Sequence, residues 1–589
     1  ITVGGLIDLT AGKDLTTKSA MTSTNNDINM RAAKIVVEKE LTADGKIDIR
    51  ASGAAGTGEV ISHEALTAKG NVILRSENDS VTTKKIVTSQ NGFIDVRAGD
   101  DVVIDEKYDA LAGTINLQAH NDVNITAAAA SLTANGNVTI TASWGEVTTY
   151  AVTSNAGNIE VTAHTDINAK GPYTANGNAP GGQITMTAGG NIILDPAAGL
   201  IAKNLVDIYA GGDVTVNSDV TSADDNIQMW AEGTMNVTGS TLTAGQHIAL
   251  NAFTNMTLTN TSADAGQDFS AILIDFFTLV PPGPATHSGG KLTITATNPG
   301  TDTIVAGRNL TIGNFAGQET PIVGGDVEIE NVDLTATNTD NEGYLWLSGQ
   351  GKLELKNSDL TTSADAASQA AFLGNPDLMY GLVGIAFNQG VTITDSSIEA
   401  GTVVSINNTN LKDTDTPVGY NYARGAAGNI NISSTALGGD AITAQINITI
   451  GNDFRTGTVG LDNMTLTGTQ DIANNVGASI VITSWGDIDL NESLLQTAWT
   501  TPDARGSGSI NLRSHTGTEI TDTDILAGTE IEIKNLDMAS PSYAATGAIT
   551  TDDNSTISSS NSSIFVQNVA GFGGDITLES DQISAHTDI

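Results

Sequence analysis

A short phrase recurs along the chain and constrains its fold more than any other feature. The run Gly-Asn-Val-Thr-Ile-Thr-Ala at 136–142 returns in related form at 157–163, 182–188 and 290–296. The small residue that closes the phrase follows the previous one after 21 to 25 residues, from Ala51 to Ala252. A period near 22 residues, with apolar and polar residues alternating inside each unit, is typical of a solenoid of short strands.

Each repeat contains about three stretches that read as strands. In the repeat that starts at Gly136 these are 138–140, 146–150 and 151–153, with the apolar residues pointing inward and threonine outward. We therefore predict an all-β fold, a single elongated right-handed parallel β-helix with about three short strands in each coil of ~22 residues. With strands ~4.8 Å apart, roughly 22–25 coils would form a rod on the order of 100–120 Å long.

Glycine followed by asparagine or aspartate marks many of the expected corners. Examples are Gly190-Asn191, Gly211-Gly212-Asp213, Gly324-Gly325-Asp326 and Gly573-Gly574-Asp575. We expect these glycines to supply turns with a positive φ angle, which glycine adopts without steric cost.

Composition supports a narrow, repetitive core and excludes several function classes. Aromatic residues make up only 4% of the 589 residues, so aliphatic side chains and alanine must fill the interior. The net charge of −42 argues against nucleic acid as a partner, because phosphate contacts need clustered lysine and arginine. An acidic surface also keeps a long protein soluble.

The chain contains no cysteine, which excludes disulfides, thiolate catalysis and cysteine-bound zinc. It has no apolar run of 18 or more residues, so no membrane span is expected in this segment. The sequences near both ends resemble the middle of the array, at 5–9 and at 574–578. We expect the chain to be a piece of a longer polypeptide or to stack end to end.

Three segments interrupt the repeat pattern and define the predicted division of the chain. We predict a regular β-solenoid over 1–260, an apolar and proline-rich insertion loop over 261–290, and a continuing β-solenoid over 291–589. The last part carries loop insertions at 361–390 and 412–427. A continuous solenoid that crosses 260–290 is preferred over two separate domains.

The insertion at 264–289 is the strongest candidate for a contact surface. It is either a loop folded back over the rod or an interaction loop for another subunit or a receptor, since exposed apolar patches need such an explanation. Deleting 265–288 should then leave the fold intact. The candidate interaction residues are Phe269, Ile272, Leu273, Phe276, Phe277, Leu279 and Val280.

The repeated phrases resemble those of filamentous haemagglutinin-like adhesins, the large secreted β-helical exoproteins of bacterial surfaces. The runs that carry the resemblance are 66–71, 132–142 and 210–216. It covers roughly residues 1–260 well and the remainder loosely. It implies an extracellular, cell-surface location and a role in adhesion or as a stalk. A recognisable secretion domain of that family is absent from this sequence.

The function we expect is that of a non-enzymatic extracellular structural and adhesive rod, a segment of a large bacterial cell-surface or secreted β-helical protein. One alternative is a self-polymerising filament or surface-layer subunit that stacks head to tail. Another is a carbohydrate-binding or polysaccharide-degrading β-helix protein. The expected partners are a second copy, end to end or through 264–289, and a host, cell-surface or glycan receptor.

No residue pattern predicts a catalytic or cofactor site. The adjacent acidic pairs Asp100-Asp101, Asp224-Asp225 and Asp552-Asp553 read as turn or surface residues, because neighbours on a strand point to opposite faces. His120 and His164 share a repeat position two coils apart, ~9.6 Å, which is too far to share one zinc ion. Ca²⁺ is the better metal candidate, since aspartate-rich turns offer oxygen ligands, although the tandem calcium repeat is absent.

Overall fold

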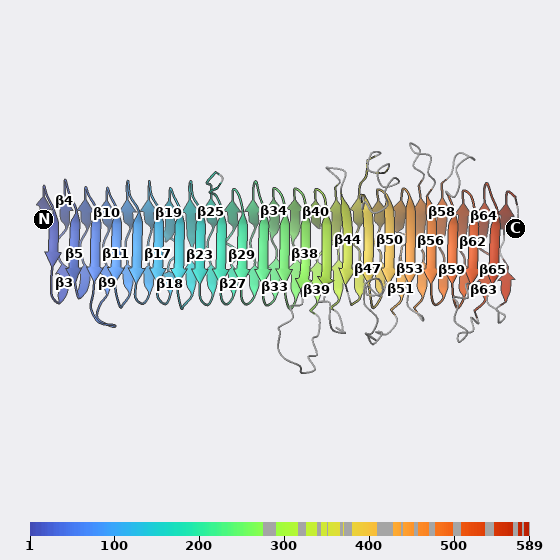
Figure 1. The fold of residues 1–589 in the computed structure, drawn as a ribbon, viewed down its shortest axis with the longest axis horizontal. Helices are drawn as coiled ribbons and strands as arrows, with labels where there is room; N and C mark the ends of the chain where they lie inside the picture. Colours follow the sequence, from blue (N-terminus) through green and yellow to red (C-terminus); the bar gives the residue numbers. More distant parts are fainter. Residues whose placement is uncertain are drawn as a thin grey trace, which may run out of the picture. The chain divides into compact units, whose positions relative to one another are not determined.

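The protein is a right-handed parallel β-helix, as shown by a computed structural model (Figure 1). The structure describes residues 1–178, 180–274, 290–315, 325–337, 343–349, 351–365, 369, 380–408, 428–436, 440–452, 457–469, 478–498, 508–535, 547–568, 575–579 and 582–587. Two compact units are present, unit 1 over Ile1–Ala252 and unit 2 over Phe253–Ile589. In each unit successive strands enter three parallel sheets in turn, here named A, B and C.

Unit 1 contains strands β1 to β35, and every third strand belongs to the same sheet. Sheet A of unit 1 contains β1 (Thr2–Val3), β4 (Met21–Ser23), β7 (Leu41–Ala43), β10 (Leu66–Ala68), β13 (Val87–Ser89), β16 (Tyr108–Ala110), β19 (Ser131–Ala134), β22 (Ala151–Ser154), β25 (Tyr173–Ala175), β28 (Leu200–Ala202), β31 (Val220–Ser222) and β34 (Thr241–Ala244). Sheet B of unit 1 contains β2 (Ile7–Thr10), β5 (Ile28–Ala32), β8 (Ile47–Ala51), β11 (Val72–Ser76), β14 (Ile94–Ala98), β17 (Ile115–Ala119), β20 (Val138–Ala142), β23 (Ile159–Ala163), β26 (Ile184–Ala188), β29 (Val206–Ala210), β32 (Ile227–Ala231) and β35 (Ile248–Ala252). Sheet C of unit 1 contains β3 (Asp14–Thr17), β6 (Lys34–Val37), β9 (Val60–Ser62), β12 (Val81–Thr83), β15 (Val102–Ile104), β18 (Val123–Ile125), β21 (Val147–Thr149), β24 (Ile167–Ala169), β27 (Ile192–Leu194), β30 (Val214–Val216) and β33 (Met235–Thr238).

Unit 2 contains strands β36 to β67 in the same cyclic order. Sheet A of unit 2 contains β37 (Ser262–Ala265), β40 (Asp302–Ala306), β43 (Val332–Ala336), β46 (Leu360–Thr362), β49 (Ile398–Ala400), β52 (Ala441–Ala444), β55 (Thr465–Gly468), β58 (Leu494–Thr497), β61 (Asp524–Ala527), β64 (Thr556–Ser559) and β67 (Gln582–Ala585). Sheet B of unit 2 contains β38 (Phe269–Ile274), β41 (Leu310–Phe315), β44 (Tyr344–Gly349), β47 (Leu382–Phe387), β50 (Val403–Asn408), β53 (Asn447–Asn452), β56 (Ser479–Ser484), β59 (Ile510–Ser514), β62 (Ile531–Asn535) and β65 (Ile564–Asn568). Sheet C of unit 2 contains β36 (Met256–Thr259), β39 (Leu292–Thr295), β42 (Val327–Glu330), β45 (Leu353–Lys356), β48 (Val391–Thr394), β51 (Ile430–Ser433), β54 (Val459–Asp462), β57 (Ile488–Asn491), β60 (Thr518–Thr521), β63 (Ile549–Thr551) and β66 (Ile576–Leu578).

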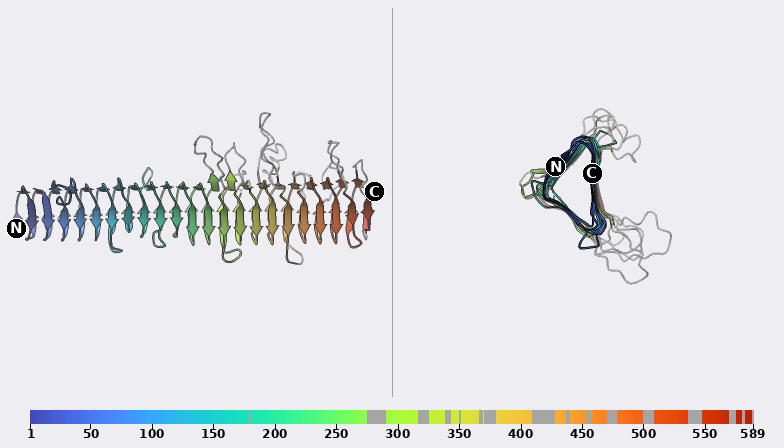
Figure 2. Two further views of the ribbon diagram at one scale, coloured as in Figure 1. Left: turned by 90° about the horizontal axis from the view of Figure 1, so that it is seen from below. Right: turned by 90° about the vertical axis from the view of Figure 1, so that its left-hand side faces the viewer.

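The coil that starts at Gly136 shows how the sequence produces this arrangement. Its strands β20, β21 and β22 follow the three predicted stretches, and each pairs in parallel with the strand one coil later. Val138 and Ile140 are fully buried, whereas Thr139 and Thr141 between them are only half-buried. Seen end-on, the ribbon of unit 1 outlines a triangle (Figure 2). The apolar residues that alternate along its strands are buried.

The glycines at the corners have a different role from the one predicted. Gly190, Gly211, Gly212 and Gly325 do not have the positive φ angle expected of them. They stand where two coils approach so closely that a Cβ atom would overlap the coil before: at Gly212, for example, with Asn191 Oδ1. The same asparagine oxygen accepts the backbone N–H of Asp213 at 2.8 Å. Glycine thus makes room for a side-chain cap that links successive coils.

Unit 2 does use left-handed residues, at the corner between sheets C and A. Asn331, Asn357, Asp395, Asn463 and Asp522 all have φ between 46° and 62°, and each follows a sheet C strand. Asparagine and aspartate tolerate this conformation better than other non-glycine residues. After Asn357, Asp395 and Asp522 the next residue carries a buried hydroxyl that accepts a backbone N–H from the coil before, as in Val332 N–H to Ser358 Oγ at 3.0 Å.

Two buried phenols of unit 1 are each paired with a threonine hydroxyl. The phenol of Tyr108 is fully buried and shares a hydrogen bond with the Thr83 hydroxyl at 2.8 Å; Tyr173 and Thr149 form the equivalent pair. Burial raises the pKa of both phenols well above the ordinary value of 10.0. These aromatic residues therefore fit the narrow core only because a threonine lies within reach.

We expect the core positions to carry the stability of each coil. Ile140→Ala removes a fully buried side chain and should lower the free energy of unfolding by about 2–5 kcal/mol in urea titrations followed by circular dichroism. The matched control is Thr139→Ala, the next residue, which points outward and should change stability by less than about 0.5 kcal/mol. Equal losses in the two variants would contradict the assignment of inward and outward faces.

Candidate functional site

The corner between sheets B and C of unit 1 gathers three aromatic rings on the outer surface. Ala119, Ala142 and Ala163 are partners in register at the ends of β17, β20 and β23. His120 and His164 follow directly in their coils, whereas Trp144 comes two residues after Ala142. The corner that holds Trp144 is one residue longer, because β21 begins at Val147, five residues after Ala142, whereas β18 and β24 begin four residues after their alanines.

The indole of Trp144 lies between the two imidazoles. Its ring centroid is 6.1 Å from that of His120, with an interplanar angle of 49°, and 5.3 Å from that of His164, with an angle of 46°. The backbone N–H of Trp144 donates to the carbonyl of His120 at 2.8 Å, which fixes the corner. Trp144 is nevertheless 62% exposed. We call His120, Trp144 and His164 the ring row.

A shallow depression lies beside the ring row and crosses four coils. Its polar lining side chains belong to Ser76, Glu77, Arg97, Gln118, His120 and Ser143. Ser76, Ala98, Ala119 and Ala142 are consecutive partners in register, so the depression runs along the axis of the coils. We call it the corner depression. It presents a guanidinium, a carboxylate, an amide, an imidazole and a hydroxyl within one open surface.

The guanidinium of Arg97 is held in place by a buried carboxylate. Asp95, whose side chain is 7% exposed, accepts hydrogen bonds from Arg97 Nε at 3.1 Å, Arg75 Nη2 at 2.8 Å and Asn116 Nδ2 at 2.7 Å. Burial of Asp95 favours its neutral form, but these hydrogen bonds and the charge of Arg97 outweigh it and hold its pKa below the usual 3.8. Arg97 therefore enters the corner depression as an oriented group that shares the single charge of Asp95 with Arg75.

Unit 2 has a related feature at the equivalent corner. Trp485 and His515 follow Ser484 and Ser514, which are partners in register. Their rings are stacked with centroids 4.4 Å apart and an interplanar angle of 10°. Trp485 is only half-buried in this stack.

Trp144 is not among the functional residues predicted from the sequence, although a signal was present. The tripeptide Ser-Trp-Gly occurs at 143–145, directly after β20, and again at 484–486, where Ser484 is the last residue of β56. Comparing corners would have exposed this repetition. The two histidines were predicted to be surface residues too far apart to share a zinc ion, and the structure places Trp144 between their exposed imidazoles.

The predicted interaction loop falls partly within regular structure. Phe269, Ile272 and Leu273 lie on strand β38, where Phe269 and Leu273 point inward and are 1% and 2% exposed, and Ile272 is half-buried. Phe269 and Leu273 are therefore core residues, and deleting 265–288 would remove a strand of sheet B. Phe276, Phe277, Leu279 and Val280 lie outside the described residues, as does the segment 412–427.

Side chains from two of the acidic pairs accept hydrogen bonds at the corners between strands. Asp101 Oδ1 accepts the backbone N–H of Asp122 at 3.1 Å, and Asp100 Oδ1 accepts a hydrogen bond from Asn121 at 2.5 Å. Asp552 binds Ser555 and the backbone N–H of Asp522. Over the part of the chain that the structure describes, no group of three or more histidine, aspartate or glutamate side chains is placed to hold a metal ion.

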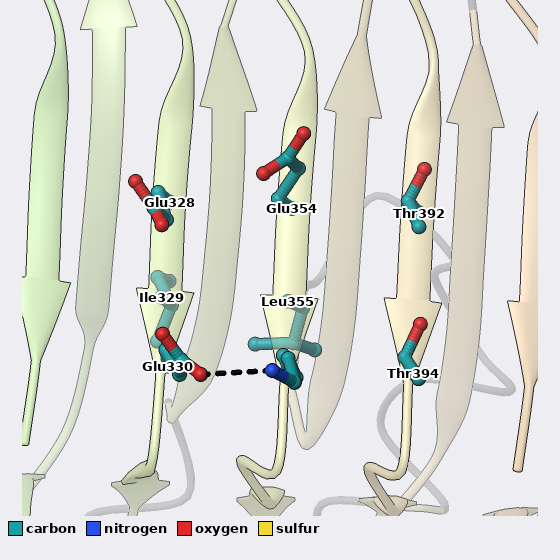
Figure 3. A pocket seen from close by; sticks show the side chains of 8 residues that line it. Glu328, Ile329, Glu330, Glu354, Leu355, Thr392 and Thr394 are labelled. Atoms are coloured by element: carbon teal, nitrogen blue, oxygen red, sulfur yellow. Dashed lines mark hydrogen bonds and ion pairs between the residues drawn. The ribbon is translucent and has the colours of Figure 1, made fainter. Parts of the chain in front are cut away.

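A second depression lies on the outer face of sheet C in unit 2 (Figure 3). Glu328, Glu354 and Thr392 are partners in register on β42, β45 and β48, and all three side chains point outward. Lys291 forms an ion pair with Glu328, and its hydrogen bond with this glutamate raises the pKa of the lysine; Lys356 Nζ pairs with Glu330 at 3.0 Å. The depression is therefore an open face on which Glu328 and Glu330 are each paired with a lysine.

Comparisons with known proteins identify no relative. No family model matches the chain, and neither a curated protein nor a solved structure matches it. Within the described ranges no helix has the length and apolar character needed to cross a membrane.

Acid should weaken the network that orients Arg97. Because the pKa of Asp95 is lower in the folded protein, its contribution to stability is present above pH ~3.8 and is lost as the pH falls below that value. Asp95→Asn should therefore lower the thermal midpoint at pH 7 and reduce the drop in midpoint between pH 5 and pH 3. An identical pH dependence in the variant and the parent chain would contradict this role of Asp95.

Proposed function

We propose that this chain is a non-enzymatic extracellular structural and adhesive rod, a segment of a large bacterial cell-surface or secreted β-helical protein. The observation that carries the proposal is the ring row beside the corner depression, a set of polar and aromatic groups exposed on a regular outer surface. Such a surface can bind a partner without any enclosed reaction site.

The way in which the coils are built supports a structural role for the chain. Inward positions are filled by aliphatic side chains, as at Val138 and Ile140, and hydrogen bonds between coils satisfy the backbone. Outward positions carry no part of the core and can vary without loss of the fold. The net charge of −42 favours solubility and disfavours adhesion through nucleic acid.

The enzyme alternative has two locations to test, each a pair of outward carboxylates in register on neighbouring sheet C strands: Glu328 with Glu354, and Asp489 with Glu519. Desolvation and the charges of Asp487 and Glu519 raise the pKa of Asp489, but both side chains of the second pair are exposed to solvent and not enclosed.

Glu328 and Glu354 face outward on neighbouring strands, at the ~4.8 Å strand spacing, which approaches the carboxyl separation of retaining glycosidases, ~5–5.5 Å. A general acid in such an enzyme has a pKa raised by burial or by a like charge. Glu328 instead forms an ion pair with Lys291, and Glu354 is exposed, so an adhesive surface describes this face better.

Adhesion is tested with beads coated with the purified 589-residue chain. We expect saturable attachment to cell or mucin surfaces, competition by free chain, and no attachment by beads coated with heat-unfolded chain. Antibodies against the chain should also label intact cells that produce it. Attachment equal to that of the unfolded control would overturn the adhesive assignment.

Turnover is tested in parallel by measuring reducing ends released from a panel of plant, bacterial and animal polysaccharides. We expect no release above the buffer control. Release that disappears in Glu328→Gln, Glu354→Gln, Asp489→Asn or Glu519→Gln, and persists in the outward-facing control Glu160→Gln, would replace the adhesive assignment with the hydrolytic one.

A further inference from the structure

We propose that the ring row and the corner depression of unit 1 form a binding site for a neutral hexopyranose glycan chain. This inference rests on the proposed adhesive function and names the ligand class of that surface. It is carried by the geometry of Trp144 and by the mixed polar groups that Arg97, Glu77 and Gln118 add beside it.

The indole of Trp144 provides a platform that suits a sugar ring. The axial C–H groups of a hexopyranose carry slight positive charge and are attracted to the negative face of an aromatic ring. Trp144 is 62% exposed, yet tilted imidazoles on both sides and a backbone hydrogen bond at 2.8 Å hold it in place. An indole has only two side-chain torsions, so it loses little conformational entropy when a ligand covers it.

The corner depression provides partners for hydroxyl groups rather than for a charge. Sugar hydroxyls both donate and accept hydrogen bonds, and the depression offers donors on Arg97 and Gln118 and acceptors on Gln118 and Glu77. An anionic ligand would need a cation without a carboxylate partner. Arg97 and Arg75 both pair with Asp95. Glu77 adds a second negative charge beside them, so these four groups carry no net charge. The balance therefore favours a neutral glycan.

The dimensions favour a chain over a single sugar. The corner depression spans four consecutive coils and the ring row spans three, and coils repeat every ~4.8 Å. His120 belongs to both, so the polar and aromatic parts are continuous. An oligosaccharide lying along the coil axis can contact both parts at once, and its affinity then comes from several weak contacts.

Trp485, at the equivalent corner of unit 2, is an example of a tryptophan that packs between coils. It is half-buried and stacks flat on His515 at 4.4 Å and 10°. Trp144 forms tilted contacts at 49° and 46° and remains largely exposed. Packing between coils therefore accounts for Trp485 but leaves most of the Trp144 surface without a function.

The test uses the full chain and saturation-transfer NMR with three neutral hexasaccharides: β-1,4-linked glucose, α-1,4-linked glucose and β-1,4-linked N-acetylglucosamine. Stacking on an exposed indole tolerates different linkages, so we expect at least one to bind. Trp144→Ala should raise its Kd by at least about 10-fold, and Trp144→Phe by less. The thermal midpoint should stay close to that of the parent chain, because the side chain is exposed.

Two variants serve as matched controls. Ile201→Ala removes an apolar side chain that is 50% exposed on sheet A of unit 1, and Trp485→Ala removes the structural tryptophan of unit 2. Both should retain the Kd of the parent chain. Gln118→Ala should weaken binding without moving the thermal midpoint.

Three results would overturn the inference: no binding of any neutral hexasaccharide at about 10 mM, binding that Trp144→Ala leaves unchanged, or binding only of a sulfated hexasaccharide that salt abolishes. Attachment of coated beads without any hexasaccharide binding would reject the glycan ligand and leave the adhesive function standing. Loss of both bead attachment and hexasaccharide binding would reject the glycan ligand and the adhesive function together.

Discussion

The parallel hydrogen-bonded contact between equivalent strands of successive coils is the interaction on which the structure depends. A single coil has no core of its own, so its apolar residues are buried only when the next coil lies at strand spacing. The coils have the least room to come this close at the corners between strands. Glycine there avoids overlap with the preceding coil, as at Gly212, and the Asn191 side chain accepts the N–H of the next coil. These residues are needed for close contact rather than for turn geometry.

This construction determines how a binding surface can arise. Because equivalent residues align along the axis, a site is assembled from one or two outward residues of each of several coils. Arg97, Gln118 and Ser143 come from three different repeats and line one depression only because the register brings them together. No short motif contains the site, which is one physical reason why it can change while the core pattern is kept.

The fold could be predicted from the sequence because its signal is repeated in every coil. The alternation at Val138, Thr139 and Ile140 placed strands and faces correctly. Phe269 and Leu273 were misread because they are large and precede a proline-rich run, although the same two-residue alternation continues through them. The surface was harder to predict, since outward residues obey no packing rule and their neighbours are set by register.

One inserted residue accounts for the difference between the two corner tryptophans. Trp485 and His515 occupy equivalent positions in corners of equal length, so their rings face each other and stack at 10°. The longer corner moves Trp144 one residue beyond the position of His120 and His164, and its ring then meets both imidazoles at angles near 50°. Because the indole does not lie parallel to the imidazoles, they leave 62% of Trp144 exposed. The insertion, rather than the tryptophan alone, thus converts a structural stack into an exposed platform.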